Sequence, residues 1–137
     1  MIRVGNKEYP NCLWDLVTSY NVEKVNISDV RLGLKTRETP SYYYVGIFED
    51  NDRLVIEKNS GLVKILDSES DGELFQCAAD AGRFLEVLLV LAEYFISCMI
   101  NKELYEDLNY REKAFKRCVD LARGEQFLDF FKYVFII

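Results

Sequence analysis

The chain has 137 residues, the usual length of a single domain, with a net charge of −6 at pH 7 and a pI near 4.8. Its hydrophobic content of 50% excludes an intrinsically disordered chain. The sequence has no histidine, which excludes Ser-His catalysis, Cys-His catalysis and metal sites built on imidazole. Carboxylate-only catalysis survives this exclusion, but no spacing in the sequence indicates the pocket that it needs. We therefore expect one domain over residues 1–137 that carries no catalytic residue and no metal.

The apolar segments favour a cytoplasmic protein over a secreted or membrane-bound one. Residues Met1–Glu8 lack the basic start, the apolar stretch and the cleavage site of a secretory signal. The longest apolar stretch, Phe84–Ile100, is interrupted by Glu86 and Glu93, each of which would cost about 2–3 kcal/mol in a bilayer core. The cysteines form no CxxC pair and have apolar neighbours, which predicts buried thiols in a reducing compartment: Cys12, Cys77, Cys98 and Cys118.

The first forty residues predict a helix, a strand and a connector. Asn11–Tyr20 favours a short amphipathic helix, with Trp14 on the side that faces the core. Val22–Val30 alternates weakly between apolar and polar residues, which is typical of an edge or half-buried strand. Arg31–Pro40 is polar, contains Gly33 and ends in proline, and we interpret it as a connector.

Three apolar strands follow in quick succession and predict an antiparallel β-meander. They are Tyr42–Phe48, Arg53–Lys58 and Leu62–Leu66. Residues 49–52 supply aspartate and asparagine for the first turn, and the second turn ends in Gly61, which can adopt the positive φ of a bulged hairpin. Because the first turn lacks the central glycine and final glutamate of a calcium-binding EF-hand loop, we interpret it as a solvated turn.

The C-terminal half favours helices. Phe75–Ala79 suits either one more short strand or the start of this half. Over Ala81–Ile100 the few polar positions form one stripe, which predicts a helix packed against the sheet. Residues 103–108 suit a short helix or a turn, residues 111–123 suit a helix ended by Gly124, and residues 126–133 suit a final helix or helical turn. The apolar segment Val134–Ile137 must be docked on the core, paired as a strand or held by a partner. The whole pattern predicts an α+β fold in which a central antiparallel β-meander sheet packs against N-terminal and C-terminal helices.

The negative charge is concentrated in the middle of the chain. Residues 41–82 contain nine acidic and three basic residues, which account for the whole net charge of −6. Such a segment repels nucleic-acid phosphates and attracts basic proteins. We therefore expect a protein partner, bound by the carboxylates of two turns and by two tyrosines of one strand: Glu49, Asp50, Asp52, Asp67, Glu69, Asp71, Glu73, Tyr42 and Tyr44.

Three consecutive tyrosines lie on the first strand of the meander. Tyr43 is expected to point to the face opposite Tyr42 and Tyr44, and at least one of these faces should pack inward. An outward tyrosine suits a protein interface, where aromatic residues are enriched, and equally suits ordinary cross-strand packing.

A series of short motifs runs through residues 12–95. In order they are Val30–Leu34, Tyr44–Phe48, Leu54–Glu57, Ser60–Asp67 and Phe84–Leu88. Together they resemble the SUKH superfamily, the Smi- and Knr-like domains that include many bacterial immunity proteins. In that family a Gly-Leu element precedes a glycine-containing strand, the meander has a glycine turn, and a helix with a Phe-Leu pair near its start packs on the sheet.

The resemblance implies an α+β fold without a cofactor and the neutralisation of a cognate protein toxin, often a nuclease or a nucleic acid deaminase, by direct binding. An acidic protein suits such a partner because its carboxylates can occupy a basic nucleic-acid site. One alternative is a housekeeping adaptor of the same fold that binds a cellular protein. The other is a small-ligand pocket or a carboxylate-dependent hydrolase between sheet and helix. We expect no direct binding of nucleic acid or membrane, and the sequence does not indicate the oligomeric state.

Overall fold

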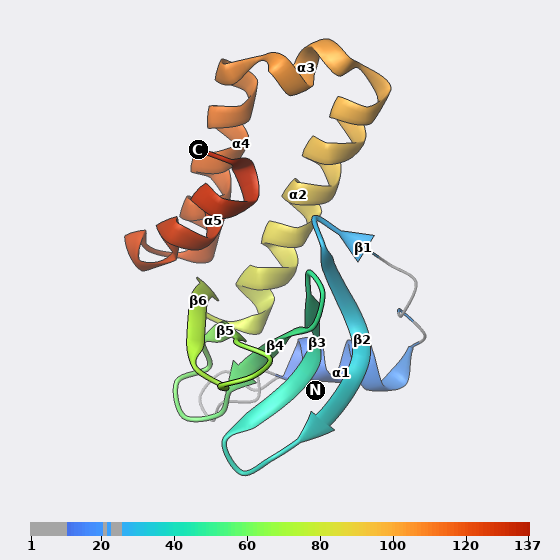
Figure 1. Cartoon of the computed structure of the whole chain (residues 1–137), viewed down its shortest axis with the longest axis vertical. Coiled ribbons are helices and arrows are strands. Elements are labelled where there is room, and N and C mark those ends of the chain that lie inside the picture. The colour runs from blue at the N-terminus through green and yellow to red at the C-terminus, as the bar shows by residue number, and fades with distance from the viewer. Residues whose placement is uncertain (1–10, 21, 23–25) are drawn as a thin grey trace.

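A computed structural model describes residues 11–20, 22 and 26–137 (Figure 1). In this part of the chain six antiparallel strands form one sheet, and their order in space is their order in the sequence. The strands are β1 (Asn26–Ile27), β2 (Val30–Glu38), β3 (Tyr42–Phe48), β4 (Asp52–Glu57), β5 (Val63–Leu66) and β6 (Glu73–Ala78). The helices are α1 (Asn11–Ser19), α2 (Ala81–Ile100), α3 (Lys102–Glu106), α4 (Leu108–Ala122), the 3₁₀ helix η2 (Glu125–Phe127) and α5 (Leu128–Phe135). The predicted α+β fold is confirmed, while the expectation for Met1–Glu8 lies outside the described residues.

The meander from β3 to β5 confirms the strands predicted there. In its first hairpin Tyr42 pairs with Glu57 and Phe48 pairs with Asp52. The second hairpin turns at Gly61, whose φ of 78° is the positive value expected from the sequence. Fully buried side chains line the inner face of these strands: Val45, Leu54, Ile56, Val63 and Ile65. Each contributes about 1.5–3 kcal/mol by its burial, so this face forms the floor of the core.

The predicted connector over Arg31–Pro40 is wrong, because Val30–Glu38 forms strand β2. Leu32 is buried, and the strand pairs with β3 over Val30–Leu32 and again at Arg37 and Glu38. The second half exposes its polar side chains to solvent. Because the side chains of this half are polar, its sequence resembles that of a loop, which explains the wrong prediction. A bulge between Leu32 and Arg37 interrupts the pairing, and within it Gly33 and Lys35 have φ of 87° and 55°.

The strand predicted over Val22–Val30 is only partly present. β1 holds Asn26 and Ile27, and the chain then reverses at Ser28 and Asp29 before β2 begins. Both turn residues have positive φ, which a two-residue hairpin with the right-handed twist of the strands requires. Residues 23–25 of the predicted strand lie outside the described residues.

The segment Phe75–Ala79, left open between strand and helix, belongs mostly to strand β6. α2 begins directly after it, with Asp80 as the N-cap residue, whose Oδ1 accepts a hydrogen bond of 2.8 Å from the backbone N–H of Arg83. Phe84 and Leu91 of α2 are fully buried in the core shared with the sheet. The helix predicted over Ala81–Ile100 is therefore confirmed.

α2 extends well beyond the sheet, and this part is covered by helices. In Figure 1 it rises from the green strands to α3, from which α4 returns alongside it. The exposed stripe of α2 is wider than its polar residues predict, because Leu89 and Ile96 are 71% and 55% exposed. α4 ends at Ala122, and its C-cap residue Arg123 has a left-handed φ of 80°. The helix therefore ends one residue earlier than the predicted helix over residues 111–123, which Gly124 was expected to end.

α5 fixes the C-terminal segment to the sheet. Phe130 is fully buried, and its ring centroid lies 5.7 Å from those of Phe48 in β3 and Phe75 in β6. Of the apolar segment Val134–Ile137, Phe135 docks into the core with 3% exposure, whereas the last two residues remain exposed. Of the three outcomes expected for this segment, docking on the core is therefore found for only half of it.

The thiols follow the expectation of burial. Cys77, Cys98 and Cys118 are buried and Cys12 is half-buried, and none of them forms a disulfide. Burial in the apolar core raises the pKa of Cys118 to about 12. Within the described residues, none of the helices combines the length and the apolar character needed to cross a bilayer.

Candidate protein-binding site

The acidic turns predicted from the sequence gather at one end of the sheet. An antiparallel meander places every second turn at the same end, and here these are the β1–β2 turn, the β3–β4 turn and the β5–β6 loop. Asp52 Oδ1 accepts a hydrogen bond of 3.1 Å from the backbone N–H of Ser68, which joins the second of these to the third. The backbone N–H of Glu49 donates to the carbonyl of Asp29 at 2.9 Å, which joins the second to the first.

Several carboxylates at this end hold the local structure together. Asp67 accepts hydrogen bonds from the backbone N–H groups of Glu69 and Ser70 and from the Ser70 hydroxyl. The bonds from Ser70, followed by weaker contributions from Glu69 and Arg53, lower the pKa of Asp67 below its usual value. These bonds close the β5–β6 loop on itself, so Asp67 has a structural function.

Two further predicted residues are neutralised by basic neighbours. Asp71 forms an ion pair with Arg53, and Glu73 forms one of 2.9 Å with Lys64. Burial acts to lower the pKa of Lys64, but the hydrogen bonds that its ammonium donates to Glu73 and Glu57 outweigh burial and raise this pKa. The charge of these two carboxylates is therefore largely balanced on the surface of the sheet.

Asp50 and Glu69 remain available to a partner. Both are exposed, and among the described residues their side chains take part in no hydrogen bond or ion pair. Asp29, which the sequence reasoning did not select, has the same character and lies beside Glu49. The position of Asp29 in a two-residue turn was not predicted from the sequence, because residues 22–30 were interpreted as one strand.

Tyr42 and Tyr44 lie on the outer face of the sheet, where they form a small apolar cluster with Val55 and Leu66. Tyr44 is only 6% exposed, because the Arg37 guanidinium covers its ring at 4.0 Å and the ring of Tyr42 contacts its edge. It packs within the sheet and presents little surface to a partner, and Tyr42 is half-buried.

Tyr43 points to the opposite face from its two neighbours. Its ring centroid lies 5.0 Å from that of Trp14 in α1, and both side chains pack against the main core. The alternation expected for the three tyrosines is thus present, with Tyr43 as the inward residue. Trp14 is half-buried and fastens α1 to the sheet.

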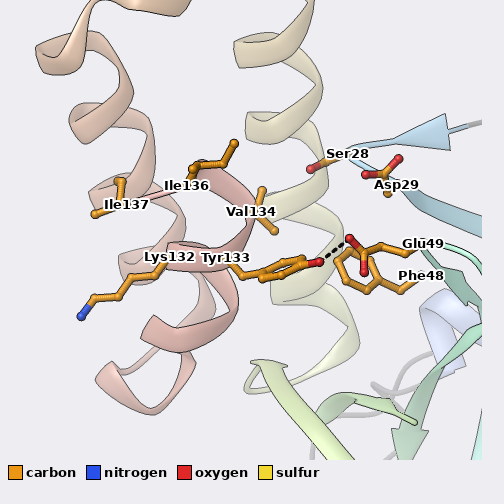
Figure 2. A pocket seen from close by; sticks show the side chains of 9 residues that line it. All are labelled: Ser28, Asp29, Phe48, Glu49, Lys132, Tyr133, Val134, Ile136 and Ile137. Carbon is orange, nitrogen blue, oxygen red and sulfur yellow. Dashed lines mark hydrogen bonds between the residues drawn. The ribbon is translucent and has the colours of Figure 1, made fainter. Parts of the chain in front are cut away.

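A cleft of about 580 Å³ lies between α5 and the acidic turns, and we call it the α5 cleft. Figure 2 shows Glu49 and Asp29 on one side and the end of α5 on the other, with Tyr133 reaching across. The Tyr133 hydroxyl donates a hydrogen bond of 2.5 Å to Glu49 Oε2. This bond, together with the nearby carboxylates of Asp29 and Asp52, raises the pKa of Tyr133.

The α5 side of the cleft is largely apolar. Ile136 and Ile137 are 73% and 52% exposed, and Val134 is half-buried between them and the core. The chain reverses at Ile136, with φ of 57°, and the backbone N–H of Ile137 donates to the carbonyl of Lys132 at 2.9 Å. In Figure 2 the Lys132 side chain extends away from the carboxylates, so the cleft joins an acidic side to an apolar side.

The described residues contain no group of three or more cysteine, aspartate and glutamate side chains arranged to hold a metal ion. Comparison of the chain with protein-family models, with curated proteins and with solved structures finds no match in any of the three.

Proposed function

We propose that the protein binds a basic protein partner through its acidic turns and the α5 cleft. The observation that supports this function is that exposed apolar side chains and carboxylates without a partner among the described side chains lie together at one end of the molecule. Asp29 and Asp50 supply negative charge, and Ile136 and Ile137 supply apolar area. Charge raises the rate of encounter with a basic protein, and burial of the apolar area supplies affinity after water is excluded.

The biological role that we propose for this binding is that of a cytoplasmic immunity protein. The SUKH-like motifs over residues 12–95 support this role, as does the position of the negative charge on connected turns. A toxin that acts on nucleic acid has a basic active site, and carboxylates can occupy it in place of phosphates. Binding alone then blocks the toxin, so no chemistry is required of this chain.

Affinity capture from a lysate of the source organism tests the proposal with three proteins. The first is the wild type. The second carries Asp29→Asn, Asp50→Asn and Glu69→Gln, which remove three carboxylates that hold no described side-chain contact. The third is a matched control with Glu103→Gln, Glu106→Gln and Asp120→Asn, which removes the same charge from the exposed surface of α3 and α4.

We expect the wild type and the control to capture the same basic protein, and the turn variant to bind it at least about tenfold more weakly. Raising the salt concentration should weaken the wild-type complex because the contact is electrostatic and exposed. The captured protein is then expressed alone and together with the wild type in a bacterial host. Growth arrest that is relieved by co-expression supports the immunity role, whereas a captured protein that never arrests growth contradicts it. Equal capture by all three proteins contradicts the binding surface.

A further inference from the structure

A second cavity, of about 340 Å³, opens on the outer face of the sheet and carries the opposite charge. Its walls include Lys35 and Arg37 of β2 and Arg53 of β4, and its floor includes Tyr44 and Ile47 of β3. Among the described residues, no acidic side chain lines this cavity, although the chain as a whole has a net charge of −6. It shares no lining residue with the α5 cleft.

The bulge in β2 creates this cavity. Pairing between β2 and β3 is lost after Leu32 and resumes at Arg37, so the intervening residues arch away from their neighbour. Lys35 sits in the arch with φ of 55°, a left-handed conformation that costs free energy for a residue with a side chain. Glycine would adopt it without this cost, so a lysine at this position is less favourable for stability than a glycine.

The cations of the cavity differ in how far they are already neutralised. Arg53 is paired with Asp71 at the edge of the cavity. Lys35 Nζ donates to the Asn51 side-chain oxygen at 2.5 Å, which uses one of its three donors and no negative charge. The Arg37 guanidinium carbon lies 4.0 Å from the centroid of the Tyr44 ring, and among the described residues the guanidinium forms no ion pair with an acid.

We propose that this cavity binds an oxyanion, a phosphate or a carboxylate, between Lys35 and Arg37. Two cations that line one concave surface and have no acidic partner among the described residues match such a group, and a guanidinium can bind its oxygens with paired N–H donors. The apolar floor lowers the exposure of the bound anion to water, which strengthens these hydrogen bonds. The proposal is independent of the function proposed for the acidic turns.

Titration followed by two-dimensional ¹H–¹⁵N NMR tests the site, with sodium chloride at matched ionic strength as the reference. One arm uses inorganic phosphate, and the other uses a tetraglutamate peptide, so that a small phosphate is distinguished from carboxylates on a polypeptide. Saturable shifts confined to the amides around Lys35, Arg37 and Ile47 in either arm support the proposal. Shifts that rise without saturation, or that match those caused by chloride, overturn it.

Three variants make the result specific. Arg37→Gln should weaken binding about tenfold, the usual effect of losing one charge-assisted contact. Lys35→Gly should weaken it similarly and yet raise the melting temperature, since glycine relieves the left-handed backbone. Lys116→Gln removes an exposed cation of α4 and should change nothing. Equal affinity for Lys35→Gly, Arg37→Gln and the wild type would refute the site even if the anion binds elsewhere.

Discussion

Tyr133 and Glu49 are joined by a side-chain hydrogen bond across 84 residues of sequence. The donor lies on the last helix and the acceptor lies in the first hairpin turn of the meander, so the bond links α5 to the acidic end of the sheet. Both groups are exposed, and the bond spans the α5 cleft. The shape of the proposed binding surface therefore depends on a contact that neither half of the chain can make alone.

Replacement of Tyr133 by phenylalanine should lower the free energy of unfolding at pH 7 by about 0.5 kcal/mol, the low end for a hydrogen bond, because the pair is exposed to water. Glu49 raises the pKa of Tyr133 in the folded protein. The contribution of the bond is therefore complete below the unfolded pKa of about 10 and is lost as pH rises through the folded pKa. Urea unfolding at neutral and alkaline pH checks this. A stability difference that persists unchanged above the tyrosine titration would contradict it.

Asp67→Ala should lower the melting temperature at neutral pH, because the hydrogen bonds from Glu69 and Ser70 to the Asp67 carboxylate disappear. These bonds lower the pKa of Asp67. Their contribution is thus present above the unfolded pKa of about 3.9 and is lost as pH falls through the folded pKa. Thermal unfolding in a series of buffers should show the wild type and variant converging in acid. Glu69→Ala, which removes a side chain with no described contact, serves as the control and should have little effect.

Phe130→Ala should cost about 3–5 kcal/mol, the usual range for deleting a fully buried aromatic ring. The lost ring contacts Phe48 and Phe75, so the deletion removes the main attachment of α5 to the sheet. Urea unfolding monitored by circular dichroism measures the loss. If the variant loses less than about 1 kcal/mol, α5 does not pack on β3 and β6 in the way described.

Gly46→Ala tests the close approach of β2 and β3. A Cβ at this position would lie 2.4 Å from the carbonyl oxygen of Arg31, which is backbone and cannot rotate away. We expect a loss of about 1–3 kcal/mol, the range for overpacking a tight site. Gly82→Ala in the first turn of α2 is the matched control. Its Cβ would meet Asp80 Oδ1 at 3.4 Å, an ordinary contact, and alanine should stabilise the helix by about 0.5–1 kcal/mol. Destabilisation of equal size at both positions would exclude the steric explanation.

The parts of the fold that could be predicted are those in which local pattern and burial agree. β3, β4 and β5 alternate or run apolar because their inner faces are buried, and α2 has few polar positions because it packs on the core over much of its length. β2 could not be predicted in this way. In its polar half, Arg37 and Glu38 pair with β3 while the side chains are exposed to water, and nothing in a polar segment distinguishes that arrangement from a loop.

The candidate site, too, could be predicted from the sequence only in part. That the β3–β4 turn and the β5–β6 loop share one end of the sheet follows from an antiparallel meander and could be predicted from the sequence. The sequence does not predict which carboxylates at this end form structural contacts, because the contacts depend on the folded loop. They are the hydrogen bonds of Asp67 and the ion pairs of Asp71 and Glu73. The α5 cleft could not be predicted from the sequence either, since it requires a tertiary contact between Tyr133 and Glu49.

The sequential order of the strands has a consequence for how the molecule acquires its binding surface. Every pair of neighbouring strands is also consecutive in the chain, so each hairpin can close a short loop at small entropic cost and the sheet can form by local steps. Docking of α5 is different, because its contact with Phe48 closes a loop that contains the strands β4 to β6 and the helices α2 to α4. Amide hydrogen exchange at the end of α5 should accordingly report openings that leave the strands protected, and the cleft would then be the part of the protein that folds last and opens first.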